Sequence, residues 1–194
     1  MTFFGGFKKR PETPKFIVRK IVIDEQLINA YGSQGPIDVQ KVIEPLWWSV
    51  SIYDSEEKYI NDLAPFTTPQ RYVFAIQWYS AEVNNGGHVQ FYDNSTGIVW
   101  EDALKGFEAI GAFRNVEIIK ESANRIGGRP SKNREERQRQ LDSCDSDLFD
   151  LDMQYYEAED EMTMLLYAYI RKNINDFLFL GEISVPNISD WRGN

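Results

Sequence analysis

The spacing of apolar residues between positions 68 and 126 constrains the fold most strongly. Three successive stripes recur every three or four residues, as one face of an α-helix requires. Paired glycines follow the first and third stripes, so we expect the first helix to open near Thr68 and Pro69 and to end at Gly86 and Gly87. The stripes are Tyr72, Ala75, Ile76, Tyr79 and Val83; Trp100, Ala103, Leu104, Phe107 and Ile110; and Ile118, Ile119, Ala123 and Ile126.

The pattern outside this region is also mostly helical. A fourth apolar stripe runs from Tyr155 to Ile170 and predicts a long helix, and another helix is expected from Glu56 to Leu63. The run KFIVRKIVI is short enough to be a strand or the start of a helix, and we expect a helix. The predicted fold is therefore all-α, a single compact multi-helix domain over residues 21–194 that follows an irregular N-terminal arm.

Charge separates this arm from the rest of the chain. Residues 1–20 carry six basic side chains against one acidic, although the whole chain has a net charge of −9. We expect residues 1–20 to be a basic, flexible arm and the remaining residues to be strongly acidic. An acidic body repels nucleic acid and attracts basic protein surfaces, so a basic DNA-binding protein is a possible partner and direct nucleic-acid binding is not expected.

Composition excludes several other classes. No apolar run approaches the roughly 18 residues of a membrane span, and the lone Cys144 cannot form an internal disulfide, which predicts a cytoplasmic protein without a membrane partner. No phosphate-binding glycine loop, CxxC pair or HExxH motif occurs, so no cofactor is expected. Whether the protein is a monomer or a homodimer stays open.

The stretch EVNNGGHVQFYDNSTG, residues 82–97, is unusually dense in hydrogen-bonding side chains. His88 with a carboxylate could in principle transfer protons, but no separate nucleophile signature accompanies it, and one histidine with Glu82 and Asp93 matches no recognised metal-ligand spacing. We therefore assign no catalytic residue and no metal site. The candidate residues of this signature stretch are Glu82, Asn84, Asn85, Gly86, Gly87, His88, Gln90 and Asn94.

Two interpretations of the signature stretch remain. In the favoured one it is architectural: Asn85, Gly86 and Gly87 turn the chain, and Asn94 with the next two residues caps the following helix. Replacement of His88 by Phe is then expected to be tolerated. In the alternative, the stretch belongs to a small-molecule-binding protein or an enzyme.

A second constellation is acidic. Nine carboxylates and no lysine or arginine occur between Asp142 and Glu161. They can form a solvated face, pair with the basic residues that precede them, or bind a partner whose Lys and Arg residues otherwise neutralise DNA phosphates. The candidate partner-binding residues are Asp145, Asp147, Asp150, Asp152, Glu157, Glu159, Asp160 and Glu161.

The signature stretch, preceded by YVFAIQWYSA and followed by VWEDALKGFEAIGA, resembles the signature of the DNA-mimic protein family. The pieces WWSVSIYD, REERQRQLD and FDLDMQYYEAEDE also fall in the expected order, so the resemblance covers residues 44–177, approximately. His88 departs from the family pattern, which usually has an aromatic residue there. The resemblance implies an all-helical fold and an acidic surface that occupies the DNA-binding face of a transcription regulator. We accordingly expect a non-enzymatic, acidic protein-binding module.

Overall fold

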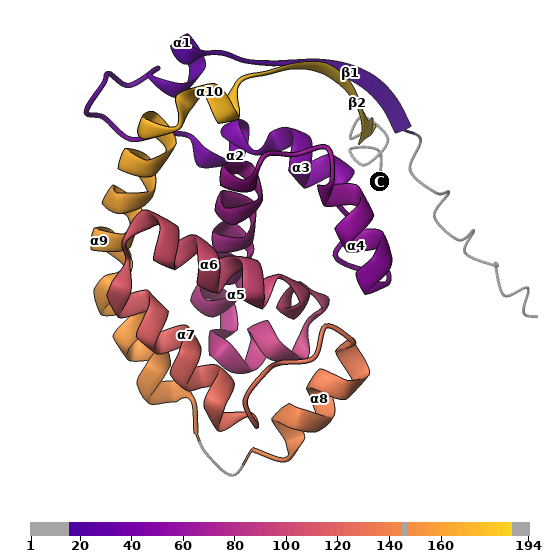
Figure 1. The fold of residues 1–194 in the computed structure, drawn as a ribbon, viewed down its shortest axis with the longest axis vertical. Helices are drawn as coiled ribbons and strands as arrows, with labels where there is room; N and C mark the ends of the chain where they lie inside the picture. The colour runs from indigo at the N-terminus through magenta and orange to yellow at the C-terminus, as the bar shows by residue number, and fades with distance from the viewer. Residues whose placement is uncertain (1–15, 145–146, 188–194) are drawn as a thin grey trace, which may run out of the picture.

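The computed structural model describes residues 16–144 and 147–187, and these form a helical protein with one ribbon of two strands (Figure 1). The all-α prediction is confirmed, with this ribbon as the addition. The elements are β1 (Phe16–Ile23), α1 (Glu25–Ile28), α2 (Val39–Val42), α3 (Glu44–Ser49), α4 (Glu56–Leu63), α5 (Thr68–Asp93), the 3₁₀ helix η1 (Ser95–Val99), α6 (Trp100–Ile110), α7 (Phe113–Arg125), α8 (Arg134–Asp142), α9 (Phe149–Lys172), α10 (Ile174–Phe177) and β2 (Phe179–Pro186).

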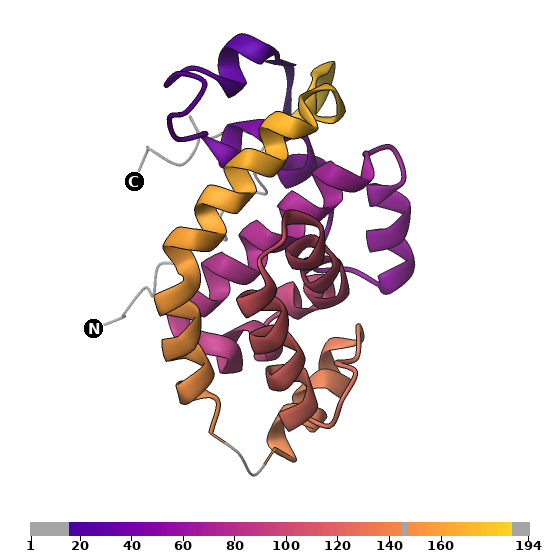
Figure 2. The same ribbon diagram turned by 60° about the vertical axis from the view of Figure 1, so that its left-hand side comes forward.

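Helix α5 is the centre of the packing. It contacts α6, η1, α8 and α9, and Phe74, Ile76 and Tyr79 on its inner face are fully buried. The helix begins with a capping box, in which the Thr67 hydroxyl accepts a hydrogen bond from the Gln70 backbone N–H and the Gln70 side chain accepts one from the Thr67 N–H. In the turned view of Figure 2, α9 runs along the outside of this arrangement, next to α5 and α7.

The first helical segment ends at the paired glycines, as predicted, but a second segment that was not predicted follows at once and belongs to the same helix α5. The helix breaks there and then continues to Asp93, because Gly87 adopts a left-handed φ of 75° and Gly86 an extended φ of −158°. Residues 82–93 of the signature stretch therefore form the kinked end of α5, and residues 95–97 belong to η1. Glycine permits such a break without steric cost, and the chain resumes helical geometry immediately afterwards.

The helix expected from KFIVRKIVI is also wrong, because this segment is strand β1. It pairs in antiparallel fashion with β2, from Phe16 opposite Pro186 to Ile23 opposite Phe179. The strand is specified by a partner near the other end of the chain, which a local pattern cannot reveal. The boundary expected at residue 20 falls inside β1, and residues 1–15 of the proposed arm lie outside the described residues.

The other helices follow the sequence pattern closely. Helix α4 begins after Ser55, whose hydroxyl caps the Lys58 N–H, and spans the predicted Glu56–Leu63. Helices α6, α7 and α9 bury the remaining three apolar stripes. None of the helices that the structure describes combines the length and the apolar character needed to cross a membrane.

Candidate functional site

The kink in α5 leaves backbone N–H groups after it without an acceptor inside the helix. Backbone N–H groups at the start of a helical segment have no acceptor within that segment. At the start of the second half of α5, the N–H of His88 instead donates to Oδ1 of Asp152, at 2.8 Å, from the first turn of α9. Asp152, 64 positions away in sequence, thus caps this helical segment in place of a local N-cap residue.

The His88 ring extends the same connection. Its Nδ1 lies 2.5 Å from Asp152 Oδ1, and its Nε2 lies 2.5 Å from the Tyr79 hydroxyl. Burial raises the pKa of Tyr79 well above its ordinary value, so the phenol stays protonated and donates to Nε2. Nε2 is then the acceptor nitrogen of the ring, and the Nδ1–H donates to the carboxylate of Asp152.

This Tyr79–His88–Asp152 relay resembles an acid–base arrangement but lies in the core. The side chains of Tyr79 and His88 are completely buried, and the ring of Tyr79 also makes edge contacts with Phe91, Phe107 and His88 itself. The geometry can hold α5 and α9 together. It offers no exposed atom of His88 to a substrate.

Four of the five other polar candidates of the signature stretch also bond to protein groups. Glu82, before the kink, accepts hydrogen bonds from Gln90 at 2.7 Å and from Asn94 at 2.9 Å, both after it. Asn84 donates to Glu159 of α9 at 2.6 Å. Asn85 is exposed, and within the described residues its side chain has no hydrogen-bond partner. The signature stretch therefore spans its own kink and ties it to α9.

The expected helix cap at Asn94 takes a different form. Asn94 precedes η1, yet its side chain makes no cap bond and is used by Glu82 instead. The next α-helix, α6, begins only at Trp100. The last three residues of the signature stretch thus lie in a 3₁₀ helix that leads into α6, and the prediction that the Asn94 side chain caps the next helix is wrong.

Arg137 of α8 is a buried residue that the sequence pattern did not identify. Its guanidinium donates to three separate carbonyl groups, those of Tyr92, Asn94 and Ser131, at 2.6 to 2.9 Å. Burial lowers the pKa of Arg137 to about 10, which leaves the group cationic at neutral pH. A Cβ at Gly97 would lie 2.3 Å from Arg137 Nε, so this glycine of the signature makes room for the arginine.

The acidic candidates divide into distinct environments. Asp152 is buried in the relay, and Glu159 is bonded to Asn84. Asp160 and Glu161 are exposed, and neither makes an ion pair with the part of the chain that the structure describes. Asp145 lies outside the described residues.

The other three acidic candidates have partners within the protein. The Asp147 side chain accepts the Phe149 N–H at the start of α9. Arg125 of α7 binds Asp150 with both terminal nitrogens, at 2.5 and 2.9 Å, and this hydrogen bonding lowers the pKa of Asp150 below its ordinary value. Arg114, at the other end of α7, binds Glu157 at 2.6 Å. Two of the expected surface charges are therefore compensated by arginines on the neighbouring helix.

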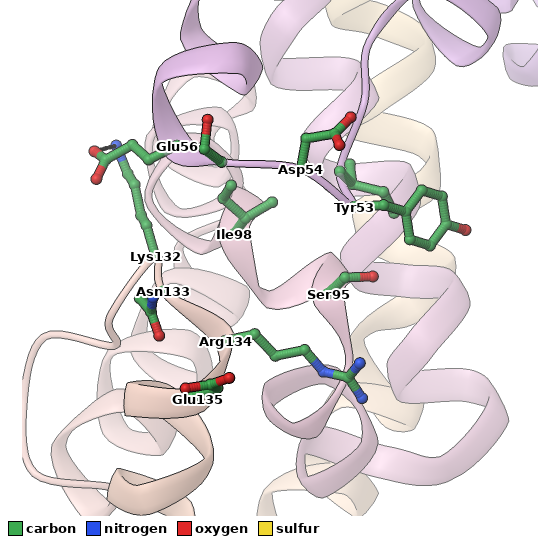
Figure 3. A pocket seen from close by; sticks show the side chains of 11 residues that line it. Tyr53, Asp54, Glu56, Ser95, Ile98, Lys132, Asn133, Arg134 and Glu135 are labelled. Carbon is green, nitrogen blue, oxygen red and sulfur yellow. Dashed lines mark ion pairs between the residues drawn. The ribbon is translucent and has the colours of Figure 1, made fainter.

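A cleft of about 460 Å³ lies between the starts of α4 and α8 and the 3₁₀ helix η1 (Figure 3). Its cations are already partnered. Lys132 reaches across to Glu56 at 3.1 Å, and Arg134 donates to the Asp93 carbonyl. Among the described residues no group of three or more His, Cys, Asp or Glu side chains could hold a metal ion.

These observations define a class of protein: a helical protein built on a glycine-kinked central helix that is bonded across the kink to an acidic outer helix. The chain belongs to the DMP19-like protein family, whose family model matches residues 64–173. The match runs from just before α5 to just after α9, a shorter stretch than the resemblance indicated. Comparison with curated proteins and with solved structures gives no match.

Proposed function

We propose that the protein is a DNA mimic, a non-enzymatic module that occupies the basic DNA-binding surface of another protein. Two facts support this proposal. The chain belongs to a family of DNA-mimic proteins, and its net charge is −9. The observation that carries it is a stripe of exposed carboxylates along one side of α9, made of Asp150, Glu157, Asp160 and Glu161.

The charge density of this stripe is comparable to that of one DNA strand. At about 1.5 Å rise per residue, the stripe from Asp150 to Glu161 is roughly 16 Å long. One DNA strand carries about one phosphate per 3.4 Å of helix axis, and so about five over that length. Four carboxylates approach this number, but a basic partner must compete with Arg114 and Arg125 for two of them.

Helix α7 adds to the same surface. Because Arg114 meets Glu157 and Arg125 meets Asp150, α7 and α9 run in opposite directions with these edges adjacent. Glu117 and Glu121 are exposed and lie between the two arginines at helical spacing. We call this surface the α7–α9 face, defined by Arg114, Glu117, Glu121, Arg125, Asp150, Glu157, Asp160 and Glu161.

The alternative, a ligand site or an active site in residues 82–97, has less support. Of the signature side chains, Gln90 and Asn94 both donate to Glu82, Asn84 bonds to α9, and His88 is enclosed in the core. A site for a small molecule needs convergent polar groups at an accessible cavity. The groups here converge on each other.

The test uses the three carboxylates of the α7–α9 face that have no ion pair among the described residues. In the variant Glu117→Gln, Asp160→Asn, Glu161→Gln, three charges are lost and no ion pair between described residues is broken. The matched control is Glu25→Gln, Glu57→Gln, Glu135→Gln. It removes three exposed carboxylates from α1, α4 and α8, and none of them has an ion-pair partner in the described part of the chain.

Each protein is immobilised and exposed to native lysate, and bound proteins are eluted with duplex DNA or with increasing salt. We expect wild type and control to retain a basic DNA-binding protein that duplex DNA displaces, and the face variant to lose it. Salt should weaken the interaction steeply, since exposed charges are screened over about 8 Å at physiological ionic strength. Equal retention by all three proteins, insensitive to salt and DNA, would contradict the proposal.

A further inference from the structure

The β1–β2 ribbon has two faces of different character. On its inner face Ile21, Ile23, Ile183 and Val185 are buried, and the ribbon contacts α3, where Arg19 forms an ion pair with Glu44. This face anchors the ribbon to the helices below it, as the upper part of Figure 1 shows.

The outer face is uncovered within the described structure and carries apolar side chains on either side of a central Lys20–Glu182 pair. Leu180 is 72% exposed, Val18 70% and Val22 48%, and Val22 lies directly opposite Leu180 in the register. A two-stranded ribbon has marginal stability by itself, and one with an apolar face on each side gains from having both covered. At the middle of this outer face Lys20 lies opposite Glu182, and neither makes an ion pair with any described residue.

We propose that the outer face of the ribbon binds the same face of a second copy of this chain. The surface is self-complementary about a two-fold axis that runs between the two sheets, parallel to the strands. That axis places β1 of each copy over β2 of the other, so that Lys20 faces Glu182 across the interface and Val22 faces Leu180. An axis perpendicular to the strands would instead place Lys20 over Lys20, and like charges oppose that arrangement.

The assignment does not depend on the proposed function. Both strands lie outside residues 64–173, so the interface belongs to the part of this chain that the family match does not include. The α7–α9 face is formed by other elements and is not part of it.

The test is a charge exchange between copies, measured as molar mass by sedimentation equilibrium of the full chain. Wild type should be a dimer. Lys20→Glu alone and Glu182→Lys alone should be monomers at concentrations where wild type is dimeric, because each homodimer would oppose like charges. An equimolar mixture of the two variants should recover the dimer mass. In the mixed dimer, position 20 of the Lys20→Glu copy faces position 182 of the Glu182→Lys copy, and these two substituted residues have opposite charges. The native Lys20 of the second copy faces the native Glu182 of the first, so this pair is also of opposite charge.

A variant without a charge change tests the interface independently, in case the charge variants misfold. Leu180→Ser changes an exposed side chain and should weaken the dimer, whereas Met164→Gln, at a similarly exposed apolar position on α9, should not. Circular dichroism of each variant should match wild type. A monomeric wild type overturns the proposal, whether the face is then covered by residues 1–15, residues 188–194 or another protein. Dimers that persist in both single-charge variants, or a mixture that stays monomeric, also overturn it.

Discussion

A single carboxylate oxygen, Oδ1 of Asp152, receives hydrogen bonds from both the backbone N–H and the ring Nδ1 of His88. The carboxylate thus caps the second half of α5 and orients the histidine toward Tyr79. Because both donors are buried, loss of this acceptor leaves them without partners in the core, where they cannot turn to water.

Asp152→Ala should therefore lower the free energy of unfolding by about 3 kcal/mol, from two lost bonds to a charged group and two orphaned donors. For a protein of this size that corresponds to a melting temperature lower by roughly 6–12 °C. Asp160→Ala on the same helix is the control, since Asp160 is exposed and unpaired in the described structure, and it should change stability by less than about 0.5 kcal/mol. Thermal denaturation followed by circular dichroism measures both, and similar values for the two variants would contradict the capping role.

Gly87→Ala should be more costly than Gly111→Ala, although both glycines have a positive φ. Gly111 (ψ 17°) lies in the left-handed helical region that other residues can enter, whereas Gly87 (ψ −176°) lies in a region open essentially to glycine alone. A Cβ at Gly87 would lie 2.2 Å from Asp152 Oδ2, whereas a Cβ at Gly111 meets nothing within 4 Å. We expect about 1 kcal/mol for Gly111→Ala from backbone strain alone, and at least about 2 kcal/mol more for Gly87→Ala because its backbone strain is larger and the capping carboxylate must move. Urea denaturation of the two variants gives the difference directly. Equal losses would mean that the position of Asp152 is not fixed by the glycine.

Arg137→Met should destabilise the protein by about 3 kcal/mol or more. The substitution leaves the carbonyl groups of Tyr92, Asn94 and Ser131 without their guanidinium donor in a buried site. Arg139→Met, two positions along α8 and exposed, is the matched control and should have a small effect. The comparison is made by urea unfolding, and a loss below about 1 kcal/mol for Arg137→Met would show that the carbonyl groups find other donors.

Asp150 should titrate below the ordinary aspartate range, because Arg125 donates two hydrogen bonds to its ionised form. A folded-state pKa below the unfolded value means that this pair stabilises the protein at neutral pH, and that its contribution disappears as the pH falls through the lowered pKa. Carboxyl-carbon NMR titration of wild type and Arg125→Met measures the effect. The pKa of Asp150 should rise in the variant, and an unchanged value would exclude Arg125 as its cause.

The sequence predicted the helices where apolar spacing is local. Helices α6, α7 and α9 each carry their own apolar stripe, and periodicity alone predicted them. It could not predict β1, whose pairing with β2 depends on a segment near the other end of the chain. It located the break at Gly86 and Gly87 but not the helical segment that follows, whose first N–H finds its acceptor in Asp152, a residue far away in sequence.

The sequence predicted which residue types belong to the candidate site, but not which of their side chains are buried or bonded to other parts of the protein. The sequence identified the polar signature residues. It could not show that Asp152, one of the acidic candidates, is buried against His88, because this depends on how α9 packs on α5. The same packing reverses the expectation for His88→Phe. Phenylalanine would leave the Tyr79 hydroxyl and the Asp152 carboxylate without their ring partner, so the structure predicts a loss of about 2–3 kcal/mol in the free energy of unfolding.

The pairing of β1 with β2 has a consequence for the order of folding. During synthesis from the amino end, Ile21 and Ile23 of β1 emerge long before β2, because their partners in the register are Gly181 and Phe179. Helices α5, α6 and α7 can begin to form from local contacts during this interval, whereas the strand has to wait. A ribosome that stalls before β2 is made therefore holds a chain with an unpaired apolar strand, which is a substrate for chaperones and a template for aggregation.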